Sequence, residues 1–133
     1  MTPTERSTKL LRRSGHLVAP VERWLMIPGR HVKRDMFGCF DLFACRPATR
    51  EIVLVQTTSL SNLPSRVAKV RETPELPGLL ACGIRALVHG WVLRGGVWRC
   101  KVVEVCAQDL KAVVVCKPPR RARRFKPALE LFA

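Results

Sequence analysis

The stretch MFGCFDLFAC (residues 36–45), followed by EIVLVQTT (51–58), decides the fold. The first stretch is almost entirely apolar apart from Asp41, which predicts a strand buried on both faces. The second is rich in β-branched residues and ends on polar ones, which predicts a second, central strand. Because the turn segment RPATR (46–50) joins them, we expect an antiparallel hairpin with Asp41 and Gln56 at comparable depth.

Further elements flank this hairpin on both sides. An apolar patch followed by a glycine predicts a first helix over 4–14, and Pro20 places the extended segment 16–24 at a sheet edge. Turn and helix signals predict the remaining elements: a hairpin around Pro28-Gly29, helices over 64–71 and 74–81, and strands over 84–91 and 97–106. The sequence therefore predicts an α/β domain over residues 1–116, with a single mixed β-sheet flanked by helices, and a basic tail over 117–133.

The charge balance indicates a polyanionic partner. The chain has 133 residues, enough for one domain, and its 24 Lys and Arg against 10 Asp and Glu give a net charge of +14. Each phosphate neutralised by Lys or Arg releases condensed counterions, so a basic surface binds nucleic acid without reading its sequence. The alternatives are a charge that only aids solubility, or a contact with the ribosome or an anionic membrane.

The cysteines and the apolar runs bear on location. Met1 to Arg13 is polar and charged, unlike a secretory leader, so we expect a reducing cytoplasm in which the six cysteines are thiols. Their spacing contains no C-x-x-C pair and does not suit zinc. No apolar run approaches the ~20 residues that span a bilayer, so we expect no membrane partner.

Asp41 is the residue that most needs an explanation. A carboxylate inside a buried apolar run is costly unless it is paired, hydrogen-bonded or bound to a cation. Carboxylate and amide oxygens suit a hard divalent ion, which polarises a phosphate and lowers the pKa of an attacking water.

Five stretches taken in order carry a resemblance: VERW (21–24), KRDMFGCFDLFAC (33–45), EIVLVQTTS (51–59), RVAKV (66–70) and VHGW (88–91). Together they resemble the Holliday-junction-resolvase-like branch of the PD-(D/E)XK nuclease superfamily, particularly its small phage and bacterial proteins. The resemblance covers about residues 5–106 and implies a restriction-endonuclease-like core with a Mg²⁺ or Mn²⁺ site.

The resemblance also implies roles for single residues. Asp41 matches the aspartate of the family motif, whereas Gln56 stands in place of the second acid and Thr58 in place of the lysine. A glutamine oxygen can coordinate the ion but brings no charge, and a threonine cannot supply a lysine's charge. Lys69 is either a displaced catalytic lysine or part of a solvated helix face.

The further acidic ligand stays open among three residues. Glu5 would lie on the first helix, Glu22 just before a strand, and Asp35 would face the metal if the strand bulges at Gly38. Ion pairs are the alternative for Glu22 and Asp35, with Arg34 among the cations available.

Two functions follow as expectations. The first is a metal-dependent endonuclease that cuts DNA, including branched or recombination intermediates, as the resemblance implies. The second is a catalytically weakened nuclease fold that serves as a nucleic-acid-binding module. Proteins of the branch that the chain resembles often act as dimers, so a homodimer stays open. The residues expected to contact nucleic acid are Arg34, Arg66, Lys69, Arg120, Arg121, Arg123 and Arg124.

Overall fold

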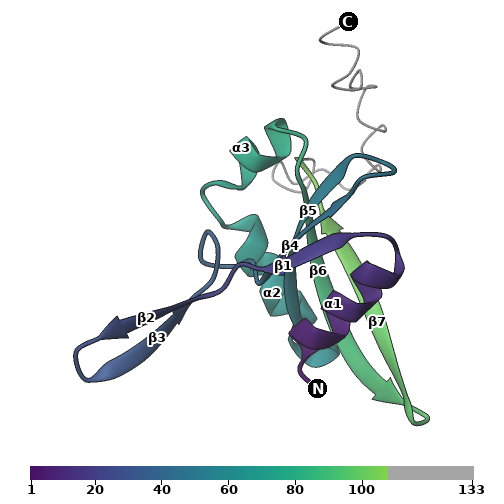
Figure 1. Ribbon diagram of the computed structural model, residues 1–133, viewed down its shortest axis with the longest axis horizontal. Helices are drawn as coiled ribbons and strands as arrows, with labels where there is room; N and C mark the ends of the chain where they lie inside the picture. Colours follow the sequence, from purple (N-terminus) through teal and green to yellow (C-terminus); the bar gives the residue numbers. More distant parts are fainter. Residues whose placement is uncertain (108–133) are drawn as a thin grey trace, which may run out of the picture.

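A five-stranded mixed sheet is the centre of the computed structural model, which describes residues 1–107 (Figure 1). The strand order is β1-β4-β5-β6-β7; β5 and β6 are parallel and the other neighbours antiparallel. The predicted α/β class with a mixed sheet and flanking helices is confirmed. The elements are α1 (Pro3–Arg13), β1 (Leu17–Pro20), β2 (Arg23–Ile27), β3 (Arg30–Arg34), β4 (Leu42–Arg46), β5 (Glu51–Ser59), η1 (Leu60–Asn62), α2 (Leu63–Arg71), α3 (Leu76–Ala81), β6 (Arg85–Arg94) and β7 (Val97–Val105).

Helices cover both faces of the sheet. On one face, Leu11 of α1 packs against Val53 and Val55 of β5. On the other, apolar residues of α2 and α3 pack against Leu54 of β5 and Val88 of β6. Figure 1 shows α1 crossing one side of the sheet and α2 lying behind it. Side chains of β5 therefore alternate between two buried layers, as expected for an apolar, β-branched strand.

The strand predicted over 36–45 is wrong in its first half. β4 begins only at Leu42, and residues 36–40 form a tight turn in which the amide of Phe40 donates to the carbonyl of Met36 over 3.0 Å. Phe37 and Gly38 have φ angles of 54° and 77°, which no strand accommodates. The turn still buries Phe40 in the core, so its apolar sequence resembles that of a strand. Asp41 consequently lies at the start of β4 rather than inside it.

The hairpin of β2 and β3 stands apart from the main sheet. Among the strands of residues 1–107, these two pair only with each other, and they project from the main sheet (Figure 1). The pairing ends at Ile27 and Arg30, so Pro28 and Gly29 form a two-residue turn, as predicted. Gly29 has a φ of 88°, a conformation that glycine adopts without strain.

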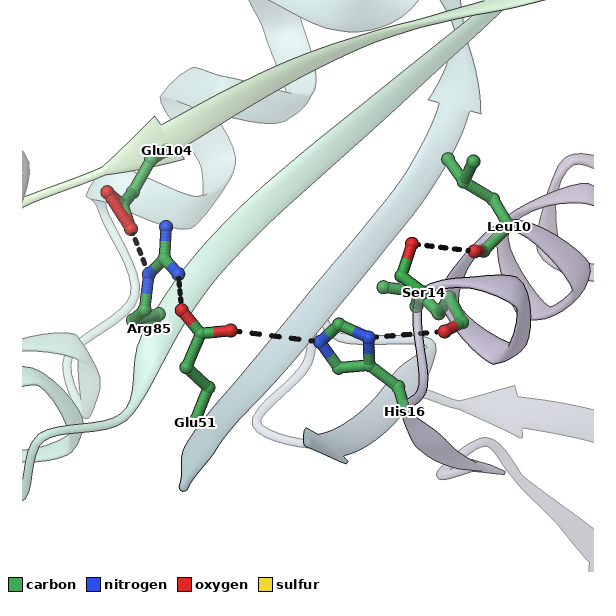
Figure 2. Close-up of polar contacts among 7 residues, drawn as sticks. Leu10, Ser14, His16, Glu51, Arg85 and Glu104 are labelled. Carbon is green, nitrogen blue, oxygen red and sulfur yellow. Dashed lines mark hydrogen bonds and ion pairs between the residues drawn. The ribbon is translucent and has the colours of Figure 1, made fainter. Parts of the chain in front are cut away.

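An ion-pair network closes the end of the sheet where β5 begins (Figure 2). The guanidinium of Arg85 on β6 lies 2.5 Å from a carboxylate oxygen of Glu51 on β5 and 2.5 Å from one of Glu104 on β7. Nε2 of His16 lies 3.9 Å from the other oxygen of Glu51. The acidic groups at this end are thus paired with cations in a structural role.

The remaining expectations concern cysteines, membranes and the tail. Cys39, Cys45, Cys82 and Cys100 are free thiols, whereas Cys106 is disulfide-bonded, so the expectation of thiols throughout is wrong there. None of the helices in the described part of the chain is long and apolar enough to cross a bilayer. The boundary at residue 116 and the basic tail lie outside the described residues.

Candidate metal centre

Asp41 is held where the β4–β5 ladder ends. The last paired residues are Leu42 and Val55, and the amide of Asp41 still donates to the carbonyl of Val55 over 2.9 Å. One step further along β5, Thr57 has no partner on β4. Its amide and its hydroxyl instead donate to Oδ2 of Asp41, over 2.8 and 3.0 Å. Asp41 is 5% exposed, and its carboxylate thus accepts the backbone hydrogen bond that a β4 residue opposite Thr57 would otherwise accept.

Gln56 contacts the same carboxylate oxygen through its amide nitrogen. Nε2 donates to Oδ2 of Asp41 over 2.8 Å and to the carbonyl of Thr57 over 3.1 Å. Oε1 of Gln56 is buried and accepts no hydrogen bond from the residues of the described region. Rotation of the amide about its last side-chain bond exchanges Nε2 and Oε1. The oxygen would then face Asp41, and two oxygens in contact need a cation or a proton between them.

Three carboxylates meet at this place. One oxygen each from Glu22, Asp35 and Asp41 lies within 4.8 Å of the other two. Glu22 immediately precedes β2 and Asp35 immediately follows β3, so the base of the hairpin brings both together. The turn over 36–40 then returns the chain so that Asp41 joins them. We call these three residues the acidic cluster.

The electrostatics of the acidic cluster favour a positive charge between its members. The pKa of Asp41 is raised to about 6, mainly by burial and also by the charges of Asp35 and Glu22, while the hydrogen bonds from Thr57 oppose the shift. Nζ of Lys33 lies 2.8 Å from Oε1 of Glu22. That hydrogen bond raises the pKa of Lys33, to which the charges of Asp41 and Asp35 also contribute. Lys33 therefore partly neutralises the acidic cluster.

The acidic cluster fits a hard divalent cation. Mg²⁺ and Mn²⁺ prefer carboxylate, carbonyl and water oxygens, and Mg²⁺ usually binds through one or two carboxylates while it keeps several waters. The unpaired Oε1 of Gln56 offers one more oxygen of the right kind beside Asp41.

The other predicted site residues lie elsewhere. Glu5 accepts a 2.6 Å hydrogen bond from the amide of Thr2 and caps α1, so it is not a member of the acidic cluster. Thr58 is buried, but the threonine that contacts Asp41 is Thr57. Lys69 is exposed on α2, and the amine that contacts a cluster carboxylate is that of Lys33.

Sequence reasoning missed Thr57 and Lys33. Thr57 contacts Asp41 only because β4 stops at Leu42, and no residue type signals that end point. Lys33 had a usable signal, since it lies two residues before Asp35 on a predicted hairpin.

The residues expected to bind nucleic acid are only partly described. Arg34 is exposed at the end of β3, and Arg66 is half-buried on α2 near the exposed Lys69. Arg120, Arg121, Arg123 and Arg124 lie beyond the described residues.

His89 belongs to a buried structural network. The indole of Trp91 donates to the Ser7 hydroxyl over 2.8 Å, and this hydroxyl lies 2.9 Å from Nδ1 of His89. The pKa of His89 is lowered to about 4, mainly by burial and also by the charge of His16. A histidine that is 2% exposed and neutral supports packing of α1 on the sheet rather than acid–base chemistry.

Comparison with known proteins gives no further guide, because no family model, curated protein or solved structure matches the chain.

Proposed function

We propose that this protein is a metal-dependent endonuclease that cuts DNA, with its metal held by the acidic cluster. The observation that carries the proposal is the convergence of Glu22, Asp35 and Asp41, whose oxygens lie within 4.8 Å of one another. Three carboxylates at this distance repel one another, and a buried one among them is costly without a bound cation.

The fold supports the same proposal. The PD-(D/E)XK superfamily places an acid at the start of one strand and its other motif residues on the neighbouring strand, as the resemblance implies. Here Asp41 immediately precedes β4 and Gln56 lies beside it on β5, within a mixed sheet that α1 covers on one face. We therefore propose a restriction-endonuclease-like core of the Holliday-junction-resolvase-like branch.

Each residue of the site has a role in this proposal. Glu22, Asp35 and Asp41 would hold Mg²⁺ or Mn²⁺, with Gln56 as a further ligand through Oε1. The ion would polarise the scissile phosphate and lower the pKa of the attacking water. Thr57 fixes the orientation of Asp41 through two hydrogen bonds.

Lys33 would supply the charge that Thr58 cannot. Its ammonium contacts the acidic cluster through Glu22, and the Lys33 side chain is 44% exposed, so it can reach a bound phosphate. Positive charge at that position stabilises the charge that develops on the phosphate in the transition state.

The net charge of +14 supports nucleic acid as the substrate. Branched or recombination intermediates are the proposed DNA structures, following the resemblance, and a homodimer would match their two-fold symmetry. Action in the cytoplasm, including that of a phage-infected host, belongs to the same proposal.

One observation favours a second function, that of a nucleic-acid-binding module without cleavage. Gln56 presents its amide nitrogen to Asp41, and together with Thr57 it satisfies Oδ2 without a metal. A carboxylate satisfied in this way can persist as a structural residue.

Cleavage assays separate the two functions. We expect purified protein to nick a four-way DNA junction or a duplex in Mg²⁺ or Mn²⁺ but not in EDTA. Asp35→Asn should abolish nicking while leaving DNA affinity in EDTA within a few-fold, because Asp35 serves the metal. Glu75→Gln, at an exposed acid remote from the acidic cluster in sequence, is the matched control and should cut normally. DNA binding without nicking on duplex, branched and single-stranded substrates would exclude the endonuclease and leave the binding module.

A further inference from the structure

The hairpin of β2 and β3 exposes side chains that proteins ordinarily bury. Trp24 is 66% exposed, Met26 83% and Ile27 40%. An isolated two-stranded ribbon is only marginally stable in water, and this one pairs with no other described strand. A projecting ribbon with exposed aromatic and aliphatic side chains is therefore expected to have a binding partner.

The register of the hairpin places Trp24 and Met26 on one face and Ile27 on the other. Trp24 lies opposite Lys33 and Met26 opposite His31, and the side chains of such directly opposed residues point to the same side. The face they form therefore combines apolar surface with the basic groups of the neighbouring strand.

The charge of the hairpin identifies the kind of partner. From residue 23 to residue 34 it carries Arg23, Arg30, Lys33 and Arg34 and no acidic residue. A second copy of the chain would bring the same four cations against these, which opposes self-association. A polyanion complements them.

We propose that the β2–β3 hairpin is an arm that enters the major groove of a DNA duplex. The major groove is about 12 Å wide and admits a two-stranded β-ribbon. Five residues per strand span about 17 Å, which is enough to cross a groove about 8.5 Å deep. In that position Trp24 and Met26 lie against base edges such as thymine methyl groups, and the arginines of the opposite face reach phosphates that line the groove.

The hairpin also connects this contact to the candidate metal centre. Glu22 immediately precedes β2 and Asp35 immediately follows β3, so both ends of the arm are members of the acidic cluster. DNA held along the arm would therefore have its backbone next to the carboxylates. The choice of DNA as the partner rests on the proposed function, whereas the arm itself requires neither metal nor cleavage.

The test measures binding in EDTA, so that it does not depend on catalysis. Fluorescence anisotropy with a labelled 20-base-pair DNA duplex, over a series of salt concentrations, gives the slope of log K against log[salt]. Arg23→Gln combined with Arg30→Gln should flatten this slope by about 1.8, or 0.9 for each lost phosphate contact on B-DNA. Arg99→Gln combined with Lys101→Gln removes the same charge from exposed positions of the edge strand β7 and should leave the slope unchanged.

An RNA duplex of the same sequence tests the groove itself. Its major groove is too deep and narrow for the ribbon, so the hairpin variant should lose less of its slope on RNA than on DNA. An unchanged slope on DNA, or equal losses on both duplexes, would overturn the proposal. So would a wild-type dimer in sedimentation that Trp24→Ser converts to monomers. If nicking fails while the hairpin variant behaves as expected, only the endonuclease is lost.

Discussion

Asp41→Asn should stabilise the metal-free protein above pH 6. The pKa of Asp41 is raised from its ordinary 3.8 to about 6, so the folded state binds the proton more tightly than the unfolded state does. Folding therefore loses stability as pH rises from about 4 to 6, and the full loss of about 3 kcal/mol persists above that range. The amide removes this penalty but weakens the bonds from Thr57, at a cost of about 1 kcal/mol. A net gain of about 2 kcal/mol raises Tm by roughly 5–10 °C in a chain of this length.

Thermal unfolding in EDTA at pH 4 and pH 8 measures this effect. The variant should melt higher than the parent at pH 8 and no higher at pH 4, where Asp41 is already protonated in the folded state. Added Mn²⁺ should raise Tm of the parent at pH 8 and leave Tm of the variant unchanged, because the variant lacks a ligand charge. Glu75→Gln supplies the same change of charge at an exposed site and should show neither effect. A variant that is destabilised equally at both pH values, with the parent's response to Mn²⁺, would refute the reasoning.

Three further changes test separate parts of the structure. Gln56→Glu should lower Tm in EDTA, since it sets a second carboxylate against Asp41, and should enlarge the gain in Tm on adding Mn²⁺; an unchanged gain would count against a metal ligand at this position. Lys33→Gln should leave Mn²⁺ affinity equal or tighter in calorimetry while slowing nicking, and unaltered nicking would remove Lys33 from catalysis. Gly90→Ala should cost about 1–3 kcal/mol in urea unfolding, because the new Cβ would lie 3.2 Å from three atoms of Leu63; an unchanged midpoint would show that Leu63 moves freely.

The strands were predictable where composition and turn signals agree. The β-branched run of β5 and the Pro28-Gly29 turn each indicate a single local structure, and both predictions are confirmed. The beginning of β4 was not predictable in the same way. Residues 36–40 are apolar because their turn places Cys39 and Phe40 in the core, and a buried turn and a buried strand share that composition.

The part of the candidate site that was predictable is the part that the pairing of β4 with β5 brings together. Asp41 and Gln56 become neighbours because a short turn fixes the register of the β4–β5 hairpin. Glu22 and Asp35 come together because they flank the two ends of the projecting hairpin. The direction in which this hairpin projects from the sheet is not determined by the spacing of residues in the sequence. The turn that brings Asp41 back to the base of the hairpin needs a positive φ at Phe37. In the sequence, the neighbouring Gly38 was the residue that indicated such a turn.

Diffraction from crystals grown with MnCl₂, recorded at the manganese absorption edge, tests the central claim most directly. We expect an anomalous peak within bonding distance of carboxylate oxygens of Glu22, Asp35 and Asp41, because such oxygens are the ligands that a hard cation prefers. We also expect the amide of Gln56 to turn its oxygen toward the ion. The absence of a peak at the acidic cluster, with Nε2 of Gln56 still donating to Asp41, would contradict the central claim.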